Sequence, residues 1–508
     1  MSDKSLAIRG VVFNWLGRGC SIFITFFLTP FLVTKLGDES YGLWAIVMAF
    51  TSYYALADMG LRGAGVKYIA QFHAVDDHES VNKVFVTSLA VYSVVSAVIL
   101  VLVGIAAYVF PFVIDIGNHA INNMRWVVLL TGATMATRML AQVFGAALTA
   151  LQRHDVSNGI AVAMQLLQAA SVVFALLMGY NLVGMAVATF AVTVLGQILR
   201  AICSYRLLPE LSFSPRYFDR ETLKMVFRFG GMIIFANAAR RLTTYSGGII
   251  VGLFFGPAAV PFFTVPQALS QKTGRLGAAI TNVMDPLTSR MDSKGDNDSL
   301  KEILVLGSRV MLAIMLSITV MWLFVGKPFL EFWIAPRYAA ESYGMLCILS
   351  FAYVFSSTSG VMRSILRGMG QLRPITQAAM VEVVGTLSIG VVLTYFFGGT
   401  GMAVAILILQ FVVGVILLPL AVCTAAGLRF SDYVVGAWFR GLAAAAPAAL
   451  TAMLLGNIVH PQRMLHVLGE SVCIAIVTCV GVFFTCLDNN HRAKIWASLT
   501  YGRFQPSK

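Results

Sequence analysis

The chain has 508 residues, of which 58% are hydrophobic and 12% charged, and its formal net charge is +13. A soluble chain of ordinary composition carries about twice that charged share, so the composition excludes a soluble globular protein. The charges gather in short segments between long apolar runs, which is typical of a protein that crosses a membrane many times.

Apolar runs long enough to cross a bilayer as helices, which takes about 20 residues, recur along the whole chain. We predict spans at 11–34, 41–61, 85–110, 126–150, 156–179, 182–205, 227–254, 258–285, 303–325, 341–366, 375–397, 401–426, 433–456 and 465–487. A β-barrel would instead show alternating segments of about ten residues. The sequence therefore predicts an all-α polytopic membrane protein of about 14 transmembrane helices.

The lysines and arginines indicate the orientation of these spans. If the N-terminus is cytoplasmic, 24 of them fall in cytoplasmic segments, 5 in outside segments and 7 within spans. Because cytoplasmic loops are enriched in positive charge, we expect both termini in the cytoplasm. The positive net charge is then explained by the orientation of the spans in the membrane and by an affinity for anionic membrane lipids. We therefore do not expect the protein to bind nucleic acid.

A short internal repeat indicates how the spans are grouped. The sequence GMAVA at 184–188 recurs 217 positions later at 401–405, and each copy opens a span after a very short turn. An even number of spans per copy predicts two six-helix lobes in parallel pseudo-repeat. We assign 1–206 to the N-terminal lobe, 227–427 to the C-terminal lobe, and 428–508 to an additional helix pair with a cytoplasmic tail.

The polar segment 207–226 joins the two lobes. We predict a cytoplasmic amphipathic helix there, with Asp219 as the N-cap residue of the apolar pattern that follows. A solvated linker with no role beyond connection is the alternative.

Charged residues within the spans are the candidate functional residues. The basic ones are Arg18, Arg138, Arg240, Arg241, Lys272, Arg275 and Arg363, and the acidic ones are Asp58, Asp285 and Glu382. Each charge at the bilayer centre costs about 2.5–3.5 kcal/mol, so these side chains must line a wet cavity, form ion pairs or reach the membrane surface. Since the bases outnumber the acids, we predict a cationic cavity for an anionic ligand, and arginine suits phosphate.

Some of these residues have plainer interpretations. Arg363 and Arg18 lie near the inner ends of their spans and could reach the membrane surface. Asp58 could pair with Arg62 four residues later. Asp58, Asp285 and Glu382 could carry a coupling H⁺ or Na⁺, and Glu382 could instead offset a neighbouring arginine.

Motifs for soluble chemistry are missing from the sequence. It contains no GxxxxGK[ST], HExxH or GxSxG motif, and its seven cysteines lack zinc-site spacing. We therefore expect neither an enzyme nor an ATP-driven pump, and neither a cofactor nor a metal.

The run TPFLVTKLGDESYGLW at 29–44, followed by DMGL at 58–61 and KYIA at 67–70, resembles bacterial polysaccharide transporters. These are the O-antigen and exopolysaccharide repeat-unit flippases of the multidrug/oligosaccharidyl-lipid/polysaccharide exporter superfamily. The resemblance implies two helix bundles around a cavity that opens to alternate sides of the bacterial inner membrane. It also implies an undecaprenyl-diphosphate-linked glycan as cargo, with a polysaccharide polymerase and a chain-length regulator as possible partners.

Three other functions stay open. A cation-coupled multidrug exporter shares the superfamily, but a cationic cavity would repel its commonly cationic substrates. A lipid II flippase would handle a similar head group. A membrane scaffold in a glycan-assembly complex would leave the polar spans 227–254 and 258–285 unexplained.

Overall fold

The computed structural model describes residues 3–54, 61–113, 121–458, 463–486 and 492. Within these ranges the side chains of residues 3–16, 18, 54, 113, 228–238, 240, 275, 276, 278–280, 282, 283, 457 and 458 lie outside the described part. The backbone separates into two compact units, Met1–Pro261 and Phe262–Lys508. Every regular element in the described part of the chain is helical, as the sequence predicts.

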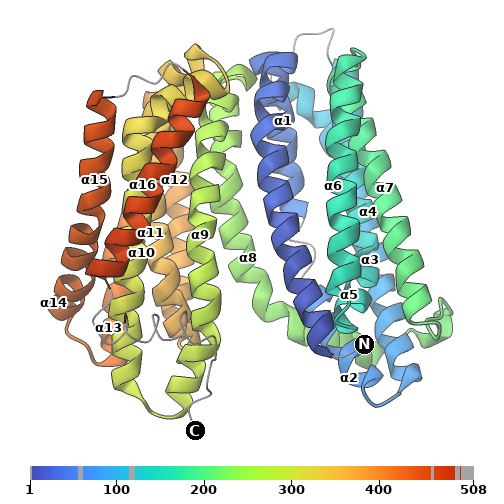
Figure 1. Cartoon of the computed structure of the whole chain (residues 1–508). Helices are drawn as coiled ribbons and strands as arrows, with labels where there is room; N and C mark the ends of the chain where they lie inside the picture. The colour runs from blue at the N-terminus through green and yellow to red at the C-terminus, as the bar shows by residue number, and fades with distance from the viewer. Residues whose placement is uncertain (1–2, 55–60, 114–120, 459–462, 487–491, 493–508) are drawn as a thin grey trace. The chain divides into compact units, whose positions relative to one another are not determined.

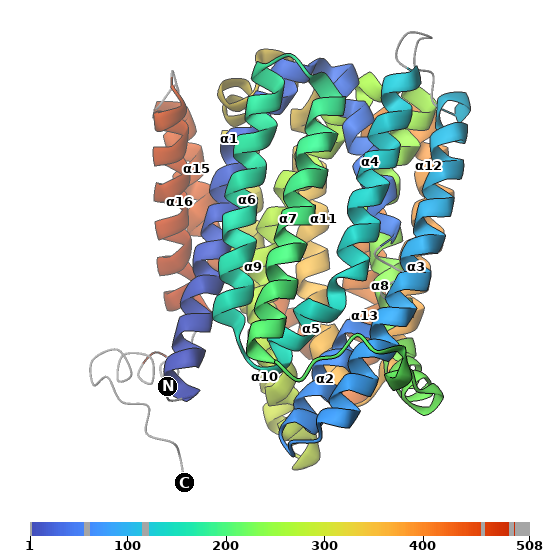
Figure 2. The same cartoon turned by 90° about the vertical axis from the view of Figure 1, so that its right-hand side faces the viewer.

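Unit 1 is a bundle of long helices (Figure 1). Its elements are α1 (Asp3–Tyr54), α2 (Leu61–His73), α3 (His78–Val113), α4 (Ile121–Leu140), α5 (Gln142–Ala150), α6 (His154–Leu177), α7 (Asn181–Leu207), the 3₁₀ turn η3 (Pro215–Tyr217), α8 (Arg220–Phe255) and the 3₁₀ turn η4 (Pro257–Ala259). In Figure 2, α6 and α7 lie side by side on one face, with α4 next to α7 and α3 next to α4.

Unit 2 begins within α9 and holds the rest of the chain. Its elements are α9 (Val260–Ser293), α10 (Asn297–Trp333), α11 (Pro336–Gly368), α12 (Leu372–Phe411), the π-helical turn η5 (Val412–Leu417), α13 (Leu418–Ala426), α14 (Phe430–Tyr433), the π-helical turn η6 (Val434–Phe439), α15 (Arg440–Ile458) and α16 (Met464–Thr485). The C-terminal helices α15 and α16 both pack against α10.

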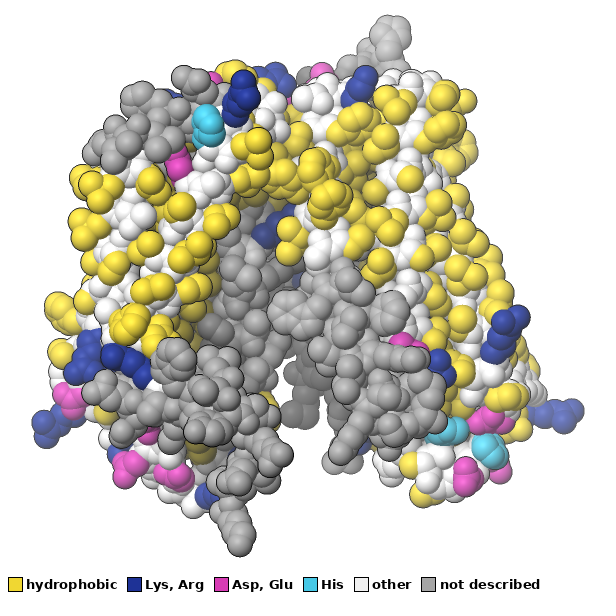
Figure 3. Space-filling model, viewed as in Figure 1, with side chains coloured by type: hydrophobic (Ala, Val, Ile, Leu, Met, Phe, Trp, Pro, Cys, Tyr) yellow, Lys and Arg dark blue, Asp and Glu magenta, His cyan; other side chains and the backbone are white. Residues whose placement is uncertain are grey.

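The surface of each unit matches a lipid environment. On the visible face of each, hydrophobic side chains cover the flank, whereas charged side chains gather towards the two ends (Figure 3). In the described part of the chain, ten helices are long and apolar enough to cross a membrane. Since only helices and closed barrels satisfy their backbone polar groups in lipid, this is a polytopic helical membrane protein.

These ten helices do not correspond one to one with the 14 predicted spans. The predicted spans 11–34 and 41–61 lie on α1, which bends at Gly37 (φ 74°, ψ 169°). Those at 375–397 and 401–426 lie on α12 and its continuation through α13, which bends at Gly398 (φ 61°, ψ −146°). The described side chains of α8 and α9 form no run of the length needed to count as a span, so the predicted spans on these two helices stay predictions.

The linker between α7 and α8 differs from the predicted amphipathic helix. Residues 208–219 form no α-helix and contain only η3. The buried Asn82 amide holds this segment, because its Nδ2 donates to the Glu210 carbonyl (2.9 Å) and its Oδ1 accepts from the Ser212 N–H (2.7 Å). The prediction for Asp219 is confirmed: its side chain accepts from the Thr222 N–H (2.7 Å) and caps α8. By its contacts α8 packs with α1, α2 and α3 in unit 1, and the predicted lobe boundary at 207–226 stays a prediction.

Turns with positive φ recur at nearly constant spacing along the chain. Of the ten described residues with positive φ, all but Gly179 and Gly427 form four pairs 217 to 219 positions apart: Gly37 and Gly256 (φ 74° and 77°), Asp76 and Gly295 (55° and 67°), Gln152 and Gly370 (56° and 70°), and Asn181 and Gly398 (47° and 61°). Few residues other than glycine adopt such angles, so this recurrence is a stronger signal than the apolar GMAVA repeat. The two halves share the geometry of these turns.

Candidate functional site: a cationic cavity in unit 1

Unit 1 contains a polar cavity of about 330 Å³ among α2, α4, α5, α6 and α7. Its polar lining consists of three arginines, four glutamines and two hydroxyl residues: Arg62, Arg138, Arg200, Gln142, Gln165, Gln168, Gln197, Ser157 and Thr193. Among the described residues that line it there is no carboxylate. The cavity therefore combines positive charge with many neutral hydrogen-bonding groups.

A helix break and a close helix pair shape the cavity. The α4 helix ends at Leu140 and α5 begins at Gln142, so Ala141 (φ −87°, ψ 2°) marks a kink at the cavity wall. On the other side, α6 and α7 approach so closely that a Cβ at Gly196 would lie 2.9 Å from Cγ of Met164. This contact sets Met164 and Gly196 at the same level of the antiparallel pair.

Two of the arginines form hydrogen bonds with neutral side chains. Nη2 of Arg138 donates to Oγ1 of Thr193 (3.3 Å), and Nη1 of Arg200 donates to Oε1 of Gln197 (3.1 Å). Arg62 is exposed, and its charge and that of Arg138 both act on Arg200. Because these partners carry no charge, the positive field is not cancelled locally. An anion entering the cavity would relieve the mutual repulsion of the arginines.

Two of the corresponding positions in unit 2 are apolar and closely packed. Phe355 lies 217 positions after Arg138, and its ring contacts those of Phe411 and Trp438 at centroid distances of 5.4 and 6.0 Å. Gly414 corresponds to Gln197, and a Cβ there would lie 2.8 Å from the Phe355 carbonyl oxygen. The polar cavity is therefore a property of unit 1 and not a by-product of the shared helix arrangement.

Three predicted site residues of unit 2, Asp285, Arg363 and Glu382, form ion pairs. Nη2 of Arg363 on α11 lies 2.6 Å from Oε1 of the buried Glu382 on α12. Asp285 on α9 accepts from Nη2 of Arg367 at 2.8 and 3.1 Å and from the Ser364 hydroxyl. These contacts join three helices. The pairing of Glu382 with an arginine was one of the alternatives that the sequence left open.

The remaining predicted residues lie in different places. Arg138 lines the unit 1 cavity. Arg241 on α8 donates from Nη1 to the Ser52 carbonyl of α1 (3.0 Å), and Lys272 is half-buried on α9. The side chains of Arg18, Arg240, Arg275 and Asp58 lie outside the described residues. Substrate binding and ion coupling by these residues stay predictions.

Three important arginines escaped sequence reasoning. Arg62, Arg200 and Arg309 all count as cytoplasmic residues in the topology argument, yet the first two line the cavity. Arg309 is buried on α10, where it donates to the carbonyls of Gly436 (2.9 Å) and Cys486 (3.1 Å). One feature of the sequence could have indicated the cavity. The polar residues Thr193, Gln197 and Arg200 are spaced so that they lie on one face of a helix.

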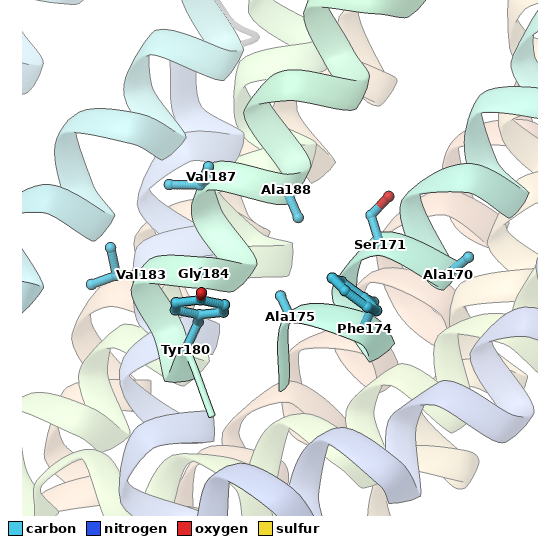
Figure 4. A pocket seen from close by; sticks show the side chains of 9 residues that line it. All are labelled: Ala170, Ser171, Phe174, Ala175, Tyr180, Val183, Gly184, Val187 and Ala188. Atoms are coloured by element: carbon cyan, nitrogen blue, oxygen red, sulfur yellow. The ribbon is translucent and has the colours of Figure 1, made fainter. Parts of the chain in front are cut away.

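A second, larger cavity of about 650 Å³ lies between the far ends of α6 and α7. The rings of Phe174 and Tyr180 flank it, and Ser171 supplies the one side-chain hydroxyl besides that of Tyr180 among its described lining residues (Figure 4). Phe174 and Tyr180 are 61% and 66% exposed. The lining carries no charge, so this apolar groove differs from the cationic cavity in the chemistry that it can bind.

Similarities to solved structures concern the fold. A lipid II flippase MurJ in an inward closed conformation matches with a TM-score of 0.70 and 12% identity, covering 97% of this chain and 100% of that one. A multidrug resistance MATE family transporter in an inward-facing conformation matches with a TM-score of 0.65 and 17% identity, covering 81% and 95%. The chain therefore shares the fold of these two solved structures.

Similarities in sequence point to polysaccharide biosynthesis. A Shigella flexneri protein named "Putative O-antigen transporter" is 24% identical over 410 residues, which are 78% of this chain and 93% of that protein. A Bacillus subtilis protein named "Uncharacterized membrane protein EpsK" is 20% identical over 320 residues, or 63% of each chain. The family model described as "Polysaccharide biosynthesis protein" matches residues 7–292, more than half of the chain. The chain therefore belongs to the polysaccharide biosynthesis protein family.

Proposed function

We propose that the protein is a flippase for an undecaprenyl-diphosphate-linked oligosaccharide repeat unit, which it moves from the cytoplasmic to the outer leaflet of the bacterial inner membrane. The product would serve the biosynthesis of O-antigen, capsule or exopolysaccharide. The observation that carries this proposal is the cavity in which Arg62, Arg138 and Arg200 meet without an acidic partner among the described lining residues. In a polysaccharide biosynthesis transporter, a diphosphate is the anion that such a cavity fits.

The mechanism would be alternating access of two six-helix lobes, with about 14 spans in all and both termini in the cytoplasm. The four paired turns with positive φ support two lobes of like construction. The basic residues that the sequence predicts to neutralise the diphosphate are Arg18, Arg240, Arg241, Lys272 and Arg275. The lipid tail would stay in the bilayer, and polymerisation or ligation outside would remove the product.

The charge of the cavity disfavours a multidrug exporter. A cationic drug entering it would meet three guanidinium groups and no carboxylate among the described lining residues. At a separation of 4 Å two unit charges repel by about 4 kcal/mol at the effective dielectric near a protein surface. The similarity to multidrug transporters therefore concerns the fold.

Deletion of the gene in its host tests the proposal. We expect lipid-linked oligosaccharide to accumulate in the cytoplasmic leaflet while surface polysaccharide is lost, and the intact gene should restore both. Unchanged surface glycan with increased drug sensitivity would refute the flippase. Arrest of peptidoglycan synthesis would instead indicate a lipid II flippase.

A further inference from the structure

We propose that Gln142, Gln165 and Gln168 determine the sugar specificity of the cavity by hydrogen-bonding the hydroxyl groups of the sugar next to the diphosphate. The arginines would bind the anion, and the glutamines would recognise what is attached to it. This inference rests on the proposed function.

The three glutamines have free hydrogen-bonding capacity. None of them donates to or accepts from another residue in the described part of the chain, whereas Gln197 accepts from Arg200 (3.1 Å). A glutamine amide offers two donors and an acceptor, and a sugar hydroxyl both donates and accepts. Inside a membrane protein, polar groups left without a partner are costly. These side chains are therefore suited to a ligand with many hydroxyl groups.

The glutamines lie close to Arg138. The contact between Met164 and Gly196 aligns α6 with α7, so Gln165 and Gln168 lie within about one helical turn of the level of Thr193, which binds Arg138. Gln142 follows Arg138 by four residues across the kink at Ala141. Charge and neutral amides thus meet at one end of the cavity, as a sugar joined to a phosphate requires.

The fold itself does not require these glutamines. In unit 2, Glu382 stands 217 positions after Gln165 and is paired with Arg363. Gly385 stands in the place of Gln168, and a Cβ there would overlap the side chain of Leu409. Ser359 replaces Gln142, and its hydroxyl donates to the carbonyl of its own helix at Phe355 (2.7 Å). At these three positions an open amide therefore occurs in unit 1 and not at the described counterparts in unit 2.

Binding measurements on the full chain in lipid nanodiscs test this inference. The probes are undecaprenyl diphosphate and the lipid-linked oligosaccharide that accumulates in the deletion strain. The double variant Gln165→Leu/Gln168→Leu should bind the glycan-bearing lipid at least 10-fold more weakly, since each lost hydrogen bond is worth a factor of about 2 to 10. Its affinity for undecaprenyl diphosphate should stay within 2-fold of wild type.

Two controls separate recognition from damage. Gln71→Leu, on the exposed face of α2, should change neither affinity, and Arg138→Gln should weaken both. If the glutamine variant weakens both lipids equally, or neither, or if wild type binds both with equal affinity, the glutamines do not recognise sugar and the flippase proposal is unaffected. If wild type binds neither lipid, or none accumulates, the proposed function itself fails.

Discussion

The backbone of Gly42 on α1 packs directly against the carbonyl of Pro257 in η4, so closely that a Cβ at position 42 would overlap the oxygen. Both residues follow equivalent turns, because Gly37 and Gly256 share φ near 75° and ψ near 170°. The turn at Gly37 and the turn at Gly256 therefore lead into segments that contact each other within unit 1. This contact depends on the absence of a side chain at position 42.

Gly42→Ala should destabilise the protein, because a backbone carbonyl cannot move aside as a flexible side chain can. We expect a loss of about 1–3 kcal/mol, in the range of overpacked cores, and a lower midpoint of thermal unfolding in detergent. The matched control is Gly19→Ala on the same helix, where a Cβ meets nothing within 4 Å. An unchanged midpoint for Gly42→Ala would mean that η4 moves away freely.

Arg138→Gln and Arg200→Gln should each reduce translocation of the lipid-linked oligosaccharide about 10- to 100-fold. Each removes a charge-assisted contact worth about 1.5–3 kcal/mol but keeps a polar side chain in the cavity. The measurement is the flipping rate in proteoliposomes, with Arg206→Gln as control, since Arg206 is exposed in the last turn of α7. Full activity in both cavity variants would show that the arginines serve structure alone.

Glu382→Gln should destabilise unit 2 more than the double change Glu382→Gln/Arg363→Leu. Removing one partner of an ion pair leaves the other charge without compensation. We expect a loss of about 1–3 kcal/mol, less than for a fully buried pair because the Arg363 side chain is 25% exposed. Thermal unfolding of the three proteins checks this order.

The same Glu382→Gln variant tests whether this carboxyl group carries a coupling proton. If it does, transport by the variant should no longer respond to a pH gradient across the proteoliposome membrane. A preserved response would restrict Glu382 to its structural pair with Arg363.

Two acidic caps should make the fold sensitive to acid. Asp77 accepts from the Ser80 N–H (3.0 Å), and Asp296 accepts from the Ser299 N–H (3.1 Å) and the Ser299 hydroxyl (2.7 Å). The hydrogen bonds from the Ser80 backbone and from the Ser299 side chain are the main causes that lower the pKa of these carboxyl groups. A lowered pKa stabilises the fold above the unfolded value of about 3.9, and this stability is lost as the pH falls through the folded value.

Asp77→Asn/Asp296→Asn should therefore reduce the fall in unfolding midpoint between pH 7 and pH 3.5. Asparagine still caps a helix but does not titrate. Asp76→Asn, which changes a residue in the same turn as Asp77 whose side chain caps neither helix, is the control. An equal fall in wild type and double variant would show that acid acts elsewhere.

Much of the fold could be predicted from hydropathy, because a bilayer imposes long apolar helices. The bends at Gly37 and Gly398 fall between predicted spans, where short polar or glycine-rich segments interrupt the apolar runs. The prediction of a helix in the linker was wrong for residues 208–219. Their conformation depends on hydrogen bonds to the side chain of Asn82, which is distant in the sequence, so the local sequence pattern could not predict it.

The candidate site was less predictable. Arg138 could be found because a lone charge in an apolar run stands out. Arg62 and Arg200 lie near span ends, where the orientation of the protein in the membrane already favours positive charge. The sequence therefore cannot distinguish an arginine that lines a cavity from one that only sets this orientation. Likewise, Arg363 and Glu382 are 19 residues apart in sequence on different helices, and only packing brings them to 2.6 Å.

The contrast between the open cavity of unit 1 and the aromatic cluster of Phe355, Phe411 and Trp438 in unit 2 has a mechanical consequence. A close-packed cluster has low compressibility and transmits strain. The helices around an open cavity can instead move towards one another without losing the packing contacts that they already make. Unit 1 is therefore the softer half. An occupant of its cavity should stiffen α4, α6 and α7, whereas the helices around Phe355 should stay equally rigid with and without an occupant.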